Sequence, residues 1–384
     1  MIRILTFIKS NLKEINPWNN IKILHTNIRG DVLSGITVAI IALPMALAFG
    51  DLAFGKILPE AGPLAGVWGA IVGGIVGGLF GGCMVGVSGP TSPKALQIAG
   101  VMLIFTQMSG ITETEEILGT AFAMIFLSGL ILVVLSMLNI SRFIHYTPYP
   151  VIAGFMCGIG IIVIFAQINN FLGVDDGFNL QNINKTGAFF VSIPSLLILF
   201  LWNTLKDKIK FLKHIPSPLV VLIIGTAIAN IMDLGVARIA EKGMENTGTA
   251  RDLFKIYLPS LSQLSALIGP AFSLAALAVL DSLLSCKVAD NMTNTRHSSN
   301  RETFGQGMAN MAAGLLGGVT TATATMRTVA NIKFGAKTPL ASIVHGLTLL
   351  VILLSLKDFI GQIPMACLAA ILIKVGIDIM DYRI

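Results

Sequence analysis

Long apolar runs separated by short polar ones cover most of the chain. The regular runs are close to the roughly 20 residues that an α-helix needs to cross a bilayer. They lie at about residues 32–50, 63–82, 116–137, 148–169, 187–205, 216–233, 266–288, 303–318, 338–356 and 360–377. This pattern predicts an all-α polytopic membrane protein.

Two further segments, near residues 83–106 and 319–334, are irregular and resemble each other. Each follows a glycine run, at residues 78–82 and 314–318, and each then alternates small and β-branched or polar residues with the period of a strand. In the first, Thr91 or Ser92 can cap a helix that has Pro93 in its first turn. In the second, Thr325 is the candidate cap. The pattern predicts two short strands, each leading into a half-helix inside the membrane, where broken helices form transporter binding sites.

The run at 63–82 carries glycine at every fourth position. Residues 69, 73, 77 and 81 form one stripe, and residues 74, 78 and 82 form a second. Small residues at this spacing let helix backbones approach closely in lipid. We expect this helix to pack tightly around the broken segments.

Composition agrees with a membrane protein: 54% of residues are hydrophobic and 12% are charged, against about 25% charged in soluble domains. The net charge of +6 comes from basic residues at segment ends, so it does not indicate nucleic-acid binding. Their distribution predicts a multi-pass protein of the inner (plasma) membrane with a cytoplasmic N-terminus. Residues 1–30 are expected to form an amphipathic segment at the membrane interface.

Several classes of chemistry lack support in the sequence. The four cysteines form no metal or disulfide motif. The complete phosphate-binding motif, Gly-x-x-x-x-Gly-Lys followed by Ser or Thr, is missing, as is a nucleophile–base or paired-carboxylate arrangement. We therefore expect neither an enzyme nor ATP-driven transport, and no cofactor.

Arg327 is the first candidate functional residue. Alignment of the two glycine runs places it opposite Thr91. Free N–H groups and positive dipole ends at two helix N-termini favour an anion. An arginine near a helix N-terminus within the membrane is unfavourable unless an anion or a structural acid compensates it. The alternatives are that Arg327 reaches the membrane interface or pairs with an acid.

Asp281 is the second candidate, because it stands alone in an apolar run with Ser285 one turn later. A carboxylate plus a hydroxyl suits Na⁺, a carboxylate alone suits a proton relay, and a structural ion pair with Arg327 is the alternative. Lys94 points either into the anion cavity or toward the interface. His345 reads as a core histidine, and residues 290–297 are polar enough for a solvated loop.

Particular motifs resemble the sulfate permease (SulP) family of anion transporters over residues 31–383. They are DVLSGITVAIIALPMALAFG at 31–50 and VADNMTNTRH at 288–297, followed by Gly305-Gln306-Gly307. Within the family, residues 43–50 and 281–285 are most similar to BicA-type, sodium-dependent bicarbonate transporters. Aspartate at 281, where most bacterial relatives have glutamate, also resembles that type. Arginine at 327 is instead similar to sulfate, dicarboxylate and exchanger members.

The resemblance implies a UraA-like, seven-plus-seven inverted-repeat fold with a core and a gate domain. The first repeat would span 31–213 and the second 214–384, incomplete by two spans and without the family's STAS domain. The implied anion ligands are Thr91, Ser92, Met45, Thr325, Met326 and Arg327. The implied Na⁺ ligands are Asp281, Ser285, Thr323 and Thr325.

The sequence thus predicts secondary active transport of a small inorganic anion, with Na⁺-dependent bicarbonate uptake as the first choice. The second is transport of sulfate or a dicarboxylate by H⁺ symport or anion exchange. An anion channel and a non-transporting remnant are further alternatives. The resemblance also implies that the protein can form a homodimer.

Overall fold

The predicted apolar runs coincide with helices. The computed structural model describes residues 14–55, 62–109, 114–140, 149–174, 187–208, 215–239, 264–355 and 357–380. The ten helices that match the regular runs are α3 (Ile28–Phe54), α4 (Gly62–Phe80), α6 (Thr114–Met137), α7 (Tyr149–Leu172), α8 (Ala188–Lys208), α9 (Ser217–Ile231), α10 (Leu264–Thr293), α11 (Ser299–Leu315), α13 (Leu340–Ser355) and α15 (Met365–Ile379). The prediction of a mostly helical protein is confirmed.

Several of these helices have the length and apolar composition of membrane spans. Within the described residues, four segments meet both criteria: Trp18–Phe54, Gly62–Phe80, Ile117–Met137 and Ala266–Thr293. Other apolar helices, among them Ser217–Ile231 and Leu340–Ser355, are shorter.

The chain before α3 forms two short helical pieces, α2 (Trp18–Ile21) and the 3₁₀ turn η1 (Leu24–Asn27). The buried Asn20 side chain donates to the carbonyl oxygens of Gly78, Leu79 and Gly81 at 2.9–3.0 Å. This fixes α2 against the C-terminal end of α4. Residues 1–13 of the predicted amphipathic segment lie outside the described part of the chain.

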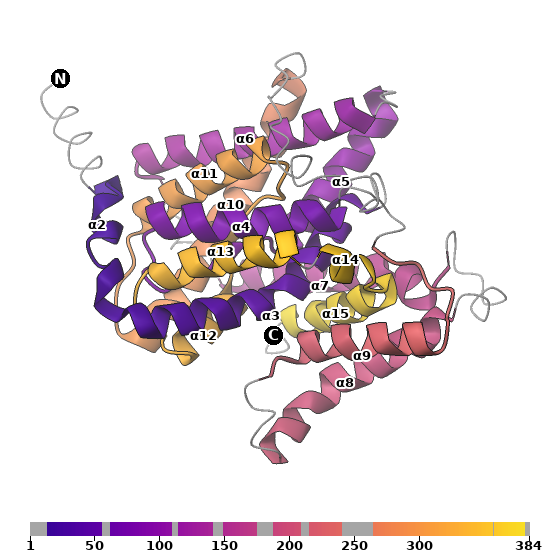
Figure 1. The fold of residues 1–384 in the computed structure, drawn as a ribbon. Coiled ribbons are helices and arrows are strands. Elements are labelled where there is room, and N and C mark those ends of the chain that lie inside the picture. The colour runs from indigo at the N-terminus through magenta and orange to yellow at the C-terminus, as the bar shows by residue number, and fades with distance from the viewer. Residues whose placement is uncertain are drawn as a thin grey trace, which may run out of the picture.

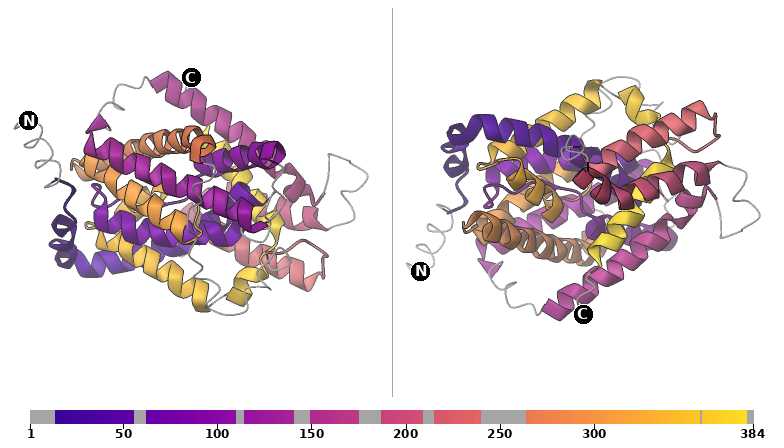
Figure 2. Two further views of the ribbon diagram at one scale, coloured as in Figure 1. Left: turned by 90° about the horizontal axis from the view of Figure 1, so that it is seen from above. Right: turned by 90° about the horizontal axis from the view of Figure 1, so that it is seen from below.

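The helices form two groups (Figure 1). One contains α3, α4, α6, α10, α11 and α13, and the other contains α7, α8, α9 and α15. The short helix α14 (Lys357–Gly361) connects the groups, and α3 packs against both. Figure 2 shows the same helices from above and from below. The repeat boundaries given above stay a prediction.

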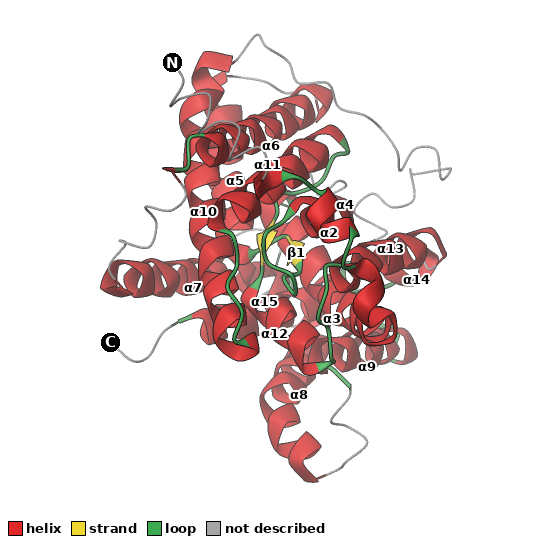
Figure 3. Ribbon diagram, turned by 90° about the vertical axis from the view of Figure 1, so that its left-hand side faces the viewer, coloured by secondary structure: helices red, strands yellow, loops and turns green. Residues whose placement is uncertain are grey.

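Two short strands lie in the middle of the first group, with a half-helix after each (Figure 3). β1 (Ser88–Gly89) precedes α5 (Ser92–Ser109), and β2 (Ala322–Thr323) precedes α12 (Thr325–Lys333). The strands pair antiparallel, with Ser88 opposite Thr323 and Gly89 opposite Ala322. Their backbone groups are therefore satisfied by each other, as burial in a membrane protein requires. The predicted strand-then-helix pattern is confirmed in both segments.

The glycine stripe of α4 packs against this strand pair. A Cβ atom added at Gly73 would lie 3.1 Å from the Gly89 Cα atom, and one at Gly77 would lie 2.7 Å from the Ser88 hydroxyl. The second stripe, which includes Gly74 and Gly78, faces α13. Glycine lets the α4 backbone come this close to the strands and to α13.

Two predictions of local structure are wrong. α10 continues to Thr293, so the first residues of the expected 290–297 loop are helical. The Asp290 carboxylate explains the tight turn that follows, because it accepts from the His297 backbone N–H at 2.9 Å and contacts the His297 ring at 2.7 Å. Thr325 is not a helix cap: Ala324 occupies the N-cap position of α12, and the Thr325 hydroxyl bonds elsewhere.

Candidate functional site

The strand pair brings together two helix N-termini that are far apart in sequence. The backbone N–H of Ala324 donates to the Val87 carbonyl at 3.0 Å, and Val87 N–H donates to the Thr328 hydroxyl at 3.2 Å. These bonds fix the start of α12 against β1. Since the strands are antiparallel, α5 and α12 leave in opposite directions, each with its N-terminus at the strand pair. Both positive dipole ends therefore act on the same small region.

The Arg327 side chain extends from the first turn of α12 to the segment that precedes α5. Its side chain is 2% exposed, and its Nη2 donates to the Pro90 carbonyl. Within the described part of the chain, Nη1 has no hydrogen-bond partner. A side chain at Gly89 would overlap the guanidinium, so glycine at this strand position gives Arg327 its path. A buried, fixed positive charge with a free N–H group is suited to bind an anion.

Asp281 joins the site from α10. The Thr91 hydroxyl donates to Asp281 Oδ2 at 2.6 Å. One turn later, Ser285 Oγ lies 2.7 Å from Thr325 Oγ1 and 2.9 Å from the Asp281 backbone oxygen. α10 therefore contacts the start of both half-helices. No ion pair joins Asp281 and Arg327 among the contacts of the described residues, although each charge acts on the other.

Lys94 is a third charged group at the site. It lies on α5, one turn after Thr91, and its side chain is fully buried. Within the described residues its Nζ atom has no hydrogen-bond partner, and Asp281 and Arg327 are the charges that act on it. Of the two sequence readings, the structure favours the cavity over the interface.

Comparison with known proteins agrees with this arrangement. A profile of the sulfate permease family matches residues 28–384. The chain belongs to the sulfate permease family. Bicarbonate transporter BicA of Picosynechococcus sp. is 37% identical over 375 residues, which cover 94% of this chain and 63% of BicA. Sulfate transporter 4.1, chloroplastic, of Arabidopsis thaliana is 26% identical over 378 residues, covering 92% of this chain and 51% of that protein. This sulfate permease chain thus spans less than two thirds of the length of these relatives.

A solved structure gives the same fold. The transmembrane domain of a cyanobacterium bicarbonate transporter BicA aligns with a TM-score of 0.81 and 34% identity, covering 93% of this chain and 89% of that one. The predicted UraA-like transporter fold is confirmed.

The remaining predicted anion ligands of the sulfate permease chain lie in different surroundings. Ser92, the first residue of α5, is buried, and its hydroxyl lacks a partner among the described residues. Met45 is buried on α3, which packs against both half-helices. Met326 is 55% exposed. Ser92 therefore adds a free polar group to the site, whereas the two methionines offer only apolar surface.

The predicted Na⁺ ligands are only partly brought together. Ser285 and Thr325 are in contact, and Asp281 is one turn from Ser285. The Thr323 hydroxyl instead contacts Glu302 and Gln306 of α11 and Ser88 of β1. The backbone changes from strand to helix between Thr323 and Thr325, so the two hydroxyls point to different neighbours.

Sequence reasoning missed the buried polar cluster on α11. Glu302 accepts from the backbone N–H groups of Gly82 and Cys83 at 2.9 and 3.0 Å, and also from Gln306 and Thr323. Asn310 bonds to both backbone groups of Thr321. Glu302, Gln306 and Asn310 are spaced by four, which places them on one helix face. The spacing of these polar residues, which begins just before the expected run at 303–318, was the available signal.

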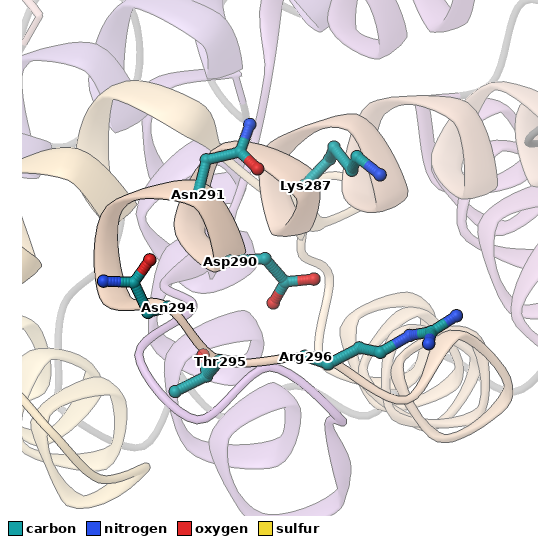
Figure 4. Close-up of a pocket in the computed structure, with 6 residues that line it drawn as sticks. All are labelled: Lys287, Asp290, Asn291, Asn294, Thr295 and Arg296. Atoms are coloured by element: carbon teal, nitrogen blue, oxygen red, sulfur yellow. The ribbon is translucent and has the colours of Figure 1, made fainter.

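A hollow lies at the C-terminal end of α10 (Figure 4). This pocket of about 610 Å³ is lined by Lys287, Asp290, Asn291, Asn294, Thr295 and Arg296. Figure 4 shows the Asp290 carboxylate between the extended Lys287 and Arg296 side chains. Asp290 lies nine positions after Asp281 on α10, a rise of about 13 Å. The pocket is therefore separate from the site between the half-helices.

Proposed function

We propose that this chain forms the transmembrane part of a secondary active transporter for a small inorganic anion. The observation that carries the proposal is the free Nη1 group of Arg327, buried at the N-termini of two half-helices. The anion would accept from this group, from the Ser92 hydroxyl and from free backbone N–H groups at the start of α5 and α12.

Bicarbonate is the first candidate anion. It is supported by the similarity to BicA, in sequence and in the fold of its transmembrane domain. Sulfate or a dicarboxylate, moved by H⁺ symport or anion exchange, is the second candidate. It is supported by Arg327 and by the similarity to a sulfate transporter.

Na⁺ coupling, which the resemblance implies, has one point in favour and one against. Asp281 supplies a carboxylate close to the paired hydroxyls of Ser285 and Thr325. Against it, the buried Lys94 and Arg327 are two positive groups that already act on Asp281, as a bound Na⁺ would. The protein would be a multi-pass protein of the plasma membrane with a cytoplasmic N-terminus, able to form a homodimer.

Uptake into proteoliposomes tests the proposed function. We expect the purified chain to take up ¹⁴C-bicarbonate with saturation, and unlabelled sulfate to compete if both anions share the site. Saturable uptake of ³⁵S-sulfate without bicarbonate uptake would select the second candidate. Unitary currents in a planar bilayer would indicate a channel. Failure to bind either anion would contradict the site itself.

Thr91→Val is expected to reduce the uptake rate by about tenfold or more. The substitution keeps the side-chain shape but removes the hydroxyl that donates to Asp281, and hydrogen bonds to charged groups contribute about 1.5–3 kcal/mol. Thr37→Val is the matched control, because the Thr37 hydroxyl bonds to the Leu33 carbonyl within its own helix. Equal uptake by the two variants would show that Thr91 does not position Asp281.

A further inference from the structure

Packing alone does not explain why the Lys94 ammonium is buried. Its side chain is 0% exposed, and Nζ has no hydrogen-bond partner in the described part of the chain. A buried ammonium is strongly unfavourable without a compensating negative charge. A lysine that served packing alone could be replaced by an apolar residue of similar length, such as methionine.

Asp281 is the acidic residue that contacts the start of α5. Thr91, which donates to the Asp281 carboxylate at 2.6 Å, begins the helical turn that contains Lys94, as the 3.0 Å bond from Ala95 N–H to the Thr91 carbonyl shows. Residues three apart on a helix lie on the same face. Lys94 therefore lies on the side of α5 that faces Asp281.

We propose that Lys94 is a tethered counter-cation for Asp281, in the position where a coupling Na⁺ would act, so that anion binding at Arg327 does not require Na⁺. The proposal rests on the proposed function, because it concerns coupling at the same site.

Charge balance supports this role. Lys94 offsets the single negative charge of Asp281, which leaves the positive charge of Arg327 for one singly charged anion. A Na⁺ ion beside Asp281 would add a third positive charge around one carboxylate, within a buried region where charges are weakly screened. The anion would then no longer neutralise the site.

The hydroxyl arrangement is also unfavourable for Na⁺. The Thr323 hydroxyl is bonded to Glu302, and the Ser285 and Thr325 hydroxyls are bonded to each other. A Na⁺ ion at the Thr323 oxygen would compete with its contacts to Glu302, Gln306 and Ser88, so the Ser285 and Thr325 oxygens are the predicted hydroxyl ligands left beside Asp281. A cation already attached to α5 needs no oxygen ligand from Thr323.

Direct ²²Na⁺ binding to the purified protein tests the proposal independently of transport. We expect the wild-type chain to show no saturable binding, and Lys94→Met and Lys94→Gln to gain it. The double variant Lys94→Met/Asp281→Asn should lose the gained binding, and Lys94→Arg should stay like wild type. Lys287→Met is the matched control: it removes an exposed lysine from α10 and should gain none.

Thermal stability gives a second readout. Since a ligand that binds the folded state raises the melting temperature, NaCl should stabilise Lys94→Met and Lys94→Gln relative to choline chloride, and should not do so for wild type. Both variants are purified in NaCl. The proposal predicts that they fold there, because Na⁺ can take the place of the missing ammonium beside Asp281. Failure of both variants to fold in NaCl would therefore contradict the proposal.

Two further outcomes would overturn the proposal. One is saturable ²²Na⁺ binding by wild type that Asp281→Asn abolishes. The other is folded Lys94 variants that bind no Na⁺. Failure of all variants to take up anions would count against the proposed function, while the ²²Na⁺ result would still decide the role of Lys94.

Discussion

Arg327→Gln is expected to weaken anion binding by at least about 30-fold and to abolish measurable uptake. Glutamine keeps a donor but removes a positive charge that is buried at 2% exposure and carries a free Nη1 group. Truncation of one partner of a buried, hydrogen-bonded charge pair costs about 2–5 kcal/mol, and each 1.4 kcal/mol is tenfold in affinity. The dipoles of α5 and α12 would remain, so weak binding is expected to persist.

Binding of ¹⁴C-bicarbonate and ³⁵S-sulfate at equilibrium measures this effect without relying on turnover. Lys333→Gln is the matched control, because it removes an exposed positive charge from the last turn of the same half-helix. Arg327→Lys should be intermediate, since lysine keeps the charge but lacks the planar fork of donors. Unchanged affinity in Arg327→Gln would mean that the guanidinium serves only to bond Pro90, and the proposed anion site would be wrong.

The half-helix segments could be predicted because their signals are local. Each glycine run and the alternation after it lie within about one strand and one helical turn, as does Pro93 in the first segment. Local reasoning also gave Asp281, because a lone charge in an apolar run is visible without a partner. It gave Arg327 because alignment of the two glycine runs places it near the start of a half-helix. It could not say that Thr91, rather than Arg327, contacts the Asp281 carboxylate, since that contact joins residues 190 positions apart.

The predicted Na⁺ ligands show where local reasoning fails. Thr321, Thr323 and Thr325 alternate in sequence, but the strand period ends at Thr323. Thr321 and Thr323 therefore both bond to Gln306 of α11, whereas Thr325, already in α12, bonds to Ser285 of α10. A shift from a period of 2 to one of 3.6 between neighbouring residues redirects the side chain.

Glu302→Ala is expected to lower the melting temperature of the protein in detergent by about 10 °C. The carboxylate accepts four hydrogen bonds and joins the turn after α4, helix α11 and strand β2. Removal of one partner from a buried charged network costs about 3–5 kcal/mol, and 1 kcal/mol shifts the melting temperature of a large domain by a few degrees. Asp378→Asn is the matched control, because this carboxylate is exposed and pairs only with Lys374 among the described residues, a contact of about 0–1 kcal/mol.

Glu302→Gln distinguishes a structural role of Glu302, in which it joins the turn after α4, helix α11 and strand β2, from a direct role in anion binding. The amide can accept at one end only, so its NH₂ group must face either the Gly82 and Cys83 N–H groups or the Thr323 hydroxyl and Gln306 amide. Unsatisfied buried donors cost about 1–3 kcal/mol each, so this variant should also be less stable than wild type. Anion binding should fall because the strand pair that aligns α5 and α12 loosens, and Thr323→Val should show the same pair of effects more weakly. A Glu302→Gln protein that melts like wild type yet binds no anion would contradict this structural role, because only a direct role at the site could then connect Glu302 with the anion.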